Sequence, residues 1–309
     1  MLSRVADSLY WLGRYVERAE NLARMVEVTR RDALETFINQ IREDIWKPVI
    51  YATSLSNDLT QEQEDSIKED PAYYITLAEV NPMSIAACIS LARENARTVR
   101  DQLSEEMWLE LNSINLYMKS GKAARAYQSD PETLFRKIIR FSIIFQGLSQ
   151  STIEHDEGWH FSRLGKFIER ADKTSRILDT LTFFRGKPSS FATMAVLRSC
   201  SGFTAFRSHY RVETSLRNVV SFLFFSPDCA RSIRFCLRRI DSALLEISGT
   251  PQGTYSNEAE RLTGSTLAML NFTGIDQLLE DGLHERIDDI QKRLNEIGQN
   301  IFENYVLLP

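Results

Sequence analysis

Two glutamate–arginine pairs stand out in this chain as candidates for a chemical role. Glu17 and Arg18 recur 152 residues later as Glu169 and Arg170. A carboxylate can act as a general base or hold an amine, and an arginine can hold a carboxylate or a phosphate through two parallel hydrogen bonds. Adjacent residues of a helix point about 100° apart, so neither pair can neutralise itself. We therefore expect each of these side chains to need a partner from another helix.

Each pair belongs to a polar stripe along one side of its helix. The first stripe consists of Gly13, Glu17, Glu20 and Arg24. The second consists of Gly165, Glu169, Asp172 and Arg176. In both stripes an acid stands four residues before an arginine, the favourable order for an ion pair along a helix. A glycine inside a helix costs about 1 kcal/mol relative to alanine, so its recurrence predicts close approach of another backbone or of a ligand.

Two interpretations of the stripes remain open. In the first, the charges form ion pairs between helices, which contribute little net stability but fix how the helices pack. In the second, both stripes converge near a pseudo-twofold axis and line a polar cleft that binds an anionic or amino-acid-like molecule. Glu17 and Glu169 would be the reactive carboxylates of this cleft. Its candidate cations are Arg14, Arg18, Arg24, Lys166, Arg170, Arg176, Arg93 and Arg97.

Long helices are the elements expected to position these residues. The chain has only 13 glycines and 8 prolines among 309 residues, and alternation typical of strands is absent from the sequence. LGRYVERAENLARMVE at 12–27 aligns with LGKFIERADKTSRILD at 164–179, and NPMSIAACI at 81–89 aligns more weakly with SPDCARSIRFCL at 226–237. Both matches occur in the same order, which indicates a duplication. We predict an all-α, internally duplicated helical bundle of two pseudo-twofold-related halves, 1–150 and 151–309, which could form one continuous domain.

Several boundaries follow from local signals. Ser3 or Asp7 could cap the first helix, which should run to residue 38 because no glycine or proline follows Gly13. Its core face should consist of Leu12, Tyr15, Val16, Ala19, Leu22, Ala23 and Val26. Asn81 and Ser226, each followed by proline, are expected to cap helices. The predicted linkers are 61–70 and 184–191, and single helices are predicted at 203–224 and 275–306.

Charge and composition narrow the function classes. The net charge of −5 argues against nucleic acid as the main partner. Residues 161–240 carry 15 Lys and Arg against 5 Asp and Glu, whereas residues 241–309 carry 4 against 12. These segments could neutralise each other across packed helices, or the first could present an anion-binding face. With no apolar run long enough to cross a bilayer, no membrane association is expected and the predicted location is the cytoplasm.

Other motifs offer weaker chemistry. The four widely spaced cysteines form no CxxC pair and are expected to be reduced and mostly buried. His155, Asp156 and His160 could ligate a metal, but Asp156 is more simply a helix N-cap, so no metal site is predicted. The sequence shows no glycine-rich phosphate loop and no recognisable Ser/His/Asp arrangement, and no cofactor is predicted.

The segments that carry these residues resemble the alpha-E family, bacterial all-helical proteins named for a Glu-Arg motif. The resemblance rests on MLSRVADSLYWLGRYVERAENLAR, NPMSIAACISLARENARTVR and GWHFSRLGKFIERADKTSR, in that order, and covers essentially the whole chain. It places the motif on Glu17, Arg18, Glu169 and Arg170. Lys166 replaces the arginine found at the corresponding Arg14, which keeps the charge but loses the planar guanidinium.

The resemblance implies an association with circularly permuted ATP-grasp proteins and with transglutaminase-like proteins. That context suggests making, attaching or trimming a peptide or amide bond. We expect a partner of an ATP-grasp amide or peptide ligase that binds an anionic or peptide-like small molecule, because a nucleophile and a phosphate-binding loop are missing from the sequence. The alternative is a stand-alone enzyme of peptide-bond chemistry with Glu17 or Glu169 as general base. The simplest reading is a non-catalytic scaffold.

Overall fold

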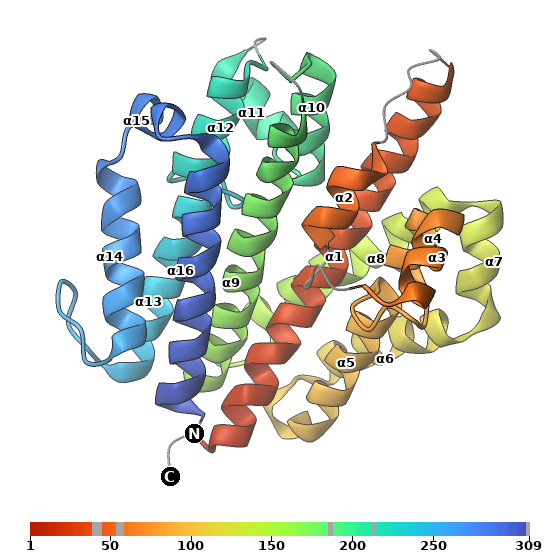
Figure 1. Cartoon of the computed structure of the whole chain (residues 1–309). Coiled ribbons are helices and arrows are strands. Elements are labelled where there is room, and N and C mark those ends of the chain that lie inside the picture. Colours follow the sequence, from red (N-terminus) through yellow and green to blue (C-terminus); the bar gives the residue numbers. More distant parts are fainter. Residues whose placement is uncertain (39–44, 54–58, 185–187, 212–213, 307–309) are drawn as a thin grey trace. The chain divides into compact units, whose positions relative to one another are not determined.

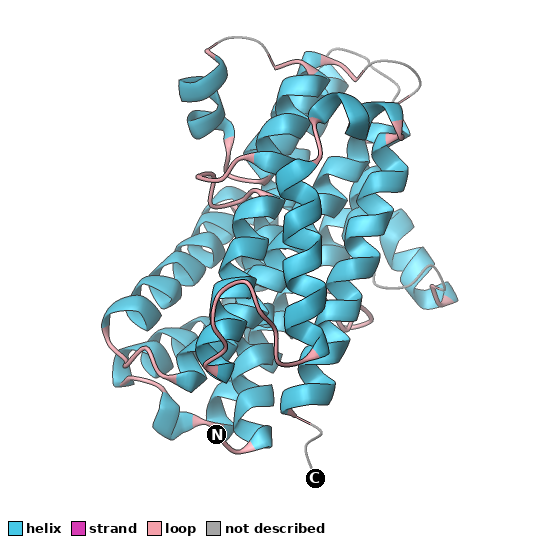
Figure 2. Cartoon of the chain, turned by 90° about the vertical axis from the view of Figure 1, so that its left-hand side faces the viewer, coloured by secondary structure: helices cyan, strands magenta, loops and turns pink. Residues whose placement is uncertain are grey.

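The protein is all-α, as the sequence predicts. The computed structural model describes residues 1–38, 45–53, 59–184, 188–211 and 214–306, and every regular element within these ranges is a helix (Figure 2). The chain divides into two compact units. The N-terminal unit comprises residues 15–154, and the C-terminal unit comprises residues 155–309 together with residues 1–14. Helix α1 (Ser3–Ile38) contributes to both units and ends at the predicted residue. Ser3, one of the two predicted caps, is already its first helical residue.

The N-terminal unit is built from α1 and a series of shorter helices. They are α2 (Trp46–Thr53), α3 (Gln61–Glu69), α4 (Pro71–Thr76), α5 (Ile85–Thr98), the 3₁₀ helix η1 (Arg100–Gln102), α6 (Glu105–Lys119), α7 (Gly121–Ser129) and α8 (Pro131–Ser151). Helix α6 packs against α5 and α8 (Figure 1). Ile89, Leu111 and Ile138, one from each of these helices, are buried. Their apolar faces form the core of this unit.

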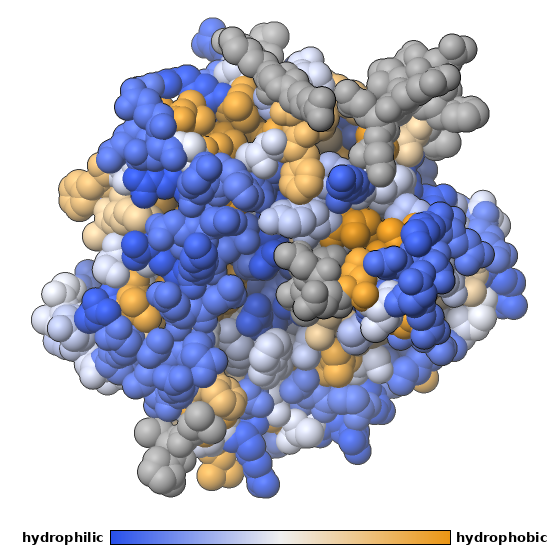
Figure 3. All heavy atoms as spheres, viewed as in Figure 1, coloured by the Kyte–Doolittle hydropathy of each residue, from blue (hydrophilic) through white to orange (hydrophobic). Residues whose placement is uncertain are grey.

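A four-helix bundle dominates the C-terminal unit. Helix α9 (Glu157–Asp179) packs on α13 (Ile233–Ser248), α13 on α14 (Glu258–Phe272), α14 on α16 (Leu283–Tyr305), and α16 back on α9 (Figure 1). Leu164, Ile240 and Ile290 are fully buried inside it. The outer sides of α14 and α16 are mostly hydrophilic (Figure 3). The remaining helices are η2 (Thr180–Phe183), α10 (Ser190–Ser199), α11 (Phe203–Tyr210), α12 (Leu216–Phe225) and α15 (Ile275–Glu280).

Two predicted caps are wrong by a few residues. Helices α5 and α13 are capped by Ser84 and Ser232, whose hydroxyls accept from the backbone N–H three residues on. Asn81 instead accepts from the Met83 N–H, and Ser226 from the Cys229 N–H, inside the turns that precede the helices. Asn, Ser and proline initiate turns as readily as helices. The Asn-Pro and Ser-Pro pairs therefore mark the turns, and the helices begin a few residues later.

Three other predicted boundaries are also corrected. Residues 61–69 form α3, not a linker, because Thr60 and Gln63 form a reciprocal capping box and Lys68 pairs with Glu64. The predicted helix 203–224 is interrupted after Arg211, which has a φ of 57°. The predicted helix 275–306 is interrupted at Gly282, which has a φ of 96°. Residues 185–187 of the other predicted linker lie outside the described residues.

The other sequence-based expectations concern thiols and membranes. None of the four cysteines forms a disulfide, and all four are buried, as predicted. Within the described part of the chain, no helix combines the length and the hydrophobicity needed to span a bilayer.

Candidate functional site

Both Glu-Arg motifs lie in helix segments that are buried on every side. All residues from 16 to 23 of α1 and from 167 to 175 of α9 are buried. The predicted core face of α1 is confirmed, with Tyr15 as its one half-buried member. Glu17 and Glu169 are 0% exposed. Since a buried charge is costly unless it is paired or hydrogen-bonded, the partners of these side chains decide what the motif can do.

In the N-terminal unit, helix α8 supplies hydrogen-bond donors to the first stripe. Gln146 Nε2 donates to Glu17 at 3.1 Å and to Glu20 at 3.2 Å. Ser142 Oγ donates to Glu20 at 2.7 Å. Asn21, one turn along α1, donates to Glu17 at 3.2 Å. The expectation that Glu17 needs a partner from another helix is confirmed, and the Gln146 amide is such a partner.

The arginines of the first motif take different partners. Arg24 pairs with Glu20 at 2.9 Å, the predicted i,i+4 ion pair. Arg18 points elsewhere, with its guanidinium 3.0 Å from the Met83 sulfur in the turn before α5 and over the Tyr15 ring. Because neighbours on a helix point about 100° apart, Glu17 and Arg18 bind different partners, Glu17 on α8 and Arg18 in the turn before α5, as expected.

In the C-terminal unit, the start of α1 meets α9 at the two predicted glycines. A Cβ on Gly13 would lie 2.1 Å from the Ser162 carbonyl oxygen, and a Cβ on Gly165 would lie 1.9 Å from the Tyr10 carbonyl oxygen. No side chain fits such a space. The predicted close approach of another backbone is confirmed at both positions.

Directly beside this contact, Arg14 Nε donates to Glu169 Oε2 at 3.0 Å. Arg14 is stacked against Tyr10 and Trp11 and its side chain is 17% exposed, whereas Glu169 is fully buried. The motif glutamate of α9 is therefore held by a cation from α1. This contact joins residues 155 positions apart in the sequence.

The rest of the second stripe repeats the pattern of the first. Arg176 pairs with Asp172 at 3.0 Å, again as predicted. Burial alone would raise the pKa of the Asp172 carboxyl, but the charges of Lys173 and Arg176 outweigh it and hold this pKa below its usual value. Arg170 donates to the Ala230 carbonyl oxygen in the turn before α13.

Three other predicted cations take separate positions. Lys166 lies over the Phe167 ring, with its ammonium 5.2 Å from the ring centre. Arg93 and Arg97 both pair with Glu94 on their own helix, and Arg93 also lies over Trp108. Both arginines therefore bind a carboxylate of their own helix, and neither bonds to Glu17.

A family model described as a predicted alpha-helical domain with a conserved ER motif matches residues 1–306. The chain belongs to the Alpha-E family. The all-helical structure and its two Glu-Arg pairs agree with that description.

Curated relatives of this Alpha-E protein are uncharacterized. One from Mycobacterium bovis and two from Mycobacterium tuberculosis are each 25% identical over 332 residues, covering 99% of this chain. The chain spans 37% of the length of each of these relatives. No solved structure was found to match it.

The sequence analysis missed a cluster that could hold a cation. Asp179, His284 and Asp288 place one ligand atom each within 4.8 Å of one another. His284 Nδ1 lies 2.8 Å from the buried Asp179, and its Nε2 lies 3.9 Å from Asp288. The hydrogen bond with Asp179 raises the pKa of His284, so a protonated histidine between two carboxylates explains the cluster as well as a metal does. The i,i+4 spacing of His284 and Asp288 was the available sequence signal.

The histidines singled out from the sequence have structural roles. Asp156 caps α9 by accepting from the Trp159 N–H, as the simpler reading predicts. His155 stacks on Trp159 with ring centres 3.7 Å apart. Burial lowers the pKa of His160.

Proposed function

We propose that this Alpha-E protein is a non-catalytic partner of an ATP-grasp amide or peptide ligase. In this proposal it binds an anionic or amino-acid-like substrate or product of the ligase, and its Glu-Arg motifs fix the geometry of the helices that carry them. A transglutaminase-like protein is a second candidate partner. The reaction would take place on the partner, and this chain would supply binding and positioning.

The burial of Glu17 and Glu169 is the observation that supports a positioning role most directly. Both carboxylates are 0% exposed. Glu17 accepts from Asn21 and Gln146, and Glu169 accepts from Arg14. A carboxylate held by such donors is oriented, which suits a group that fixes the geometry of its neighbours.

The alternative, a stand-alone enzyme with Glu17 or Glu169 as general base, fits these contacts less well. A general base must come within hydrogen-bond reach of the proton that it removes. Hydrogen bonds to the ionised form also weaken a carboxylate as a base. An enzymatic role would require the reacting glutamate to exchange its present partners for substrate.

We also infer that the two motif segments descend from a duplication, and matching contacts support it. Arg18 and Arg170 both reach the turn that precedes the next long helix of their own unit, at Met83 and at Ala230. The helices after these turns are both capped by serine. The sequence repeat aligns the same two capping serines, Ser84 and Ser232.

Reconstitution with a candidate partner tests the proposed function. The tagged chain is co-expressed with an ATP-grasp protein of the same organism, and ATP-dependent amide formation is measured for each protein alone and for the pair. We expect the two proteins to co-purify, the pair to exceed the ligase alone, and this chain alone to form or cleave no amide bond. Peptide turnover by this chain alone would establish the enzyme alternative. If this chain neither binds the ligase nor changes its rate of amide formation, only the scaffold interpretation would remain.

A further inference from the structure

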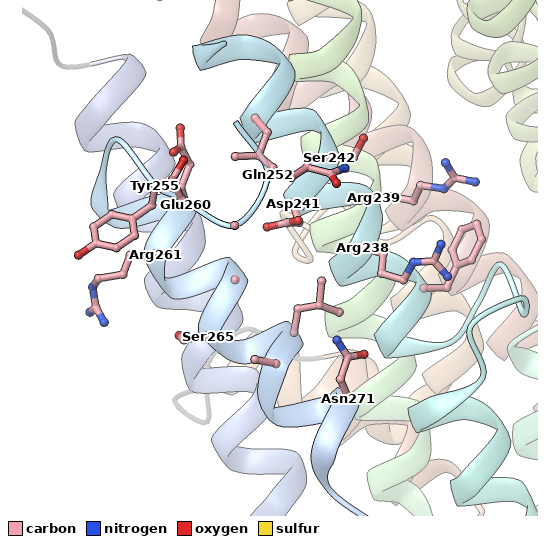
Figure 4. A pocket seen from close by; sticks show the side chains of 17 residues that line it. Arg238, Arg239, Asp241, Ser242, Gln252, Tyr255, Glu260, Arg261, Ser265 and Asn271 are labelled. Carbon is pink, nitrogen blue, oxygen red and sulfur yellow. The ribbon is translucent and has the colours of Figure 1, made fainter. Parts of the chain in front are cut away.

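A pocket between α13 and α14 lies apart from the Glu-Arg motifs. Its volume is about 730 Å³, within the range of small-molecule sites. Residues 235–245 of α13 form one wall, residues 260–271 of α14 form the other, and the segment 252–255 borders both (Figure 4). Carboxylates, guanidinium groups, hydroxyls and amides all contribute to the lining, so the pocket is suited to a polar ligand.

Asp241 is the acidic group of this pocket that is left for a ligand. Its side chain is half-buried and makes no hydrogen bond or ion pair with any residue that the structure describes. Gly264 on the facing helix lies close to it, since a Cβ there would be 3.9 Å from the Asp241 Oδ1, an ordinary van der Waals contact. Burial, and then the charge of Glu260, raise the pKa of Asp241. The positive charge of an ammonium group beside Asp241 would favour the ionised carboxylate and so oppose both effects.

The other acid of the lining, Glu260, is already occupied. Its carboxylate accepts from the backbone and the hydroxyl of Ser256, from Asn257 and from Tyr305. Burial alone would raise the pKa of Glu260, but hydrogen bonds from Ser256, Ser248 and Thr250 outweigh it and lower the pKa. Glu260 therefore fixes the segment 252–257 and adds negative potential near Asp241, while Asp241 keeps its hydrogen-bonding capacity.

Two arginines lie on the side of Asp241 that faces away from Glu260. Figure 4 shows Arg238 and Arg239 on one side of Asp241 and Glu260 with Tyr255 on the other. Arg239 lies over the Phe235 ring at 4.9 Å and has no carboxylate partner among the described residues. Arg238 donates one hydrogen bond, to the Pro227 carbonyl oxygen. These cations belong to the basic segment 161–240.

We infer that this pocket binds a zwitterionic small molecule of amino-acid or dipeptide size, with its ammonium group on Asp241 and its carboxylate toward Arg239. The pocket carries both signs of charge, and the two unpaired groups are opposite in sign. The carboxylate of Asp241 would repel a simple anion. A simple amine would make no ion pair with Arg239. The inference needs no ligase partner, so it can stand or fail independently of the proposed function.

Binding of alanylalanine to the purified full chain tests the inference. We expect saturable binding by calorimetry, with ethylamine and acetate each binding more weakly than the dipeptide. Asp241→Asn should weaken alanylalanine binding by about tenfold or more, because a charge-assisted hydrogen bond is lost. Arg239→Gln should weaken binding of alanylalanine but leave ethylamine unchanged. Glu246→Gln, the same charge change on an exposed part of α13 outside the lining, is the matched control and should bind normally.

Stability of the unliganded variant separates loss of the site from loss of the fold. A carboxyl whose folded pKa is raised destabilises the fold as pH rises above its unfolded value. Asp241→Asn should therefore melt at a temperature equal to or above that of the wild type at pH 7. Unchanged alanylalanine binding by Asp241→Asn, or no binding by the wild type at millimolar dipeptide, would overturn the inference.

Discussion

Replacing Gly165 with alanine is expected to destabilise the protein by about 3 kcal/mol or more, although alanine is normally the better helix residue. The new Cβ would lie 1.9 Å from the Tyr10 carbonyl oxygen and 3.1 Å from the Arg14 backbone nitrogen. Both neighbours are backbone atoms of a helix, so neither can move without displacing the start of α1. That displacement would also disturb the contact between Arg14 and Glu169.

Urea denaturation of Gly165→Ala and of a matched control measures this effect. Gly147 lies inside α8, and a Cβ there would meet nothing within 4 Å. Gly147→Ala should therefore stabilise the protein by up to about 1 kcal/mol. The same sign for both variants would show that α1 and α9 do not approach each other as described.

The second large effect is expected at the buried ion pair between Arg24 and Glu20. Arg24→Met should cost about 2–4 kcal/mol, because it removes the guanidinium that pairs with the buried carboxylate of Glu20, which also accepts from Ser142 and Gln146. The chain offers a control of nearly identical local geometry. Arg293 and Asp289 form an i,i+4 pair at the same distance of 2.9 Å, but their side chains are 34% and 38% exposed.

Arg293→Met should change the free energy of unfolding by less than about 0.5 kcal/mol, because solvent screens an exposed pair. The difference between the two variants therefore isolates the effect of burial. Equal losses for both would mean that Glu20 is hydrated in solution, and the polar stripe would then be a surface feature.

Much of the fold could be predicted from the sequence, because the features that determine it are local. The length of α1, its core face and the two i,i+4 ion pairs follow from helical periodicity alone. The recurrence of Gly13 and Gly165 identified a close contact, because a mid-helix glycine is unfavourable unless space demands it. The proline-containing turns were placed correctly, although the serines that cap the following helices were not.

The partners of the motif residues could not be predicted from the sequence, because tertiary packing determines them. Gln146 and Ser142 belong to a helix more than 120 residues from Glu17 and Glu20, and neither carries a distinctive sequence signal. The pocket on α13 and α14 depends on which face of each helix is left uncovered. Asp241 looks like any surface acid in the sequence. Helix α3, with no buried residue, resembles a linker by composition.

Whether the motif glutamates position or react is decided most directly by the activity of a reconstituted ligase pair containing Glu17→Gln or Glu169→Gln. The rate is measured per folded complex, with Glu246→Gln as the matched charge control. We predict turnover within about threefold of the wild type whenever the complex forms. The two substitutions should instead lower the stability of this chain. An intact complex whose rate falls by about a hundredfold or more, the contribution expected of a general base, would contradict a positioning role and make one of these carboxylates a catalyst.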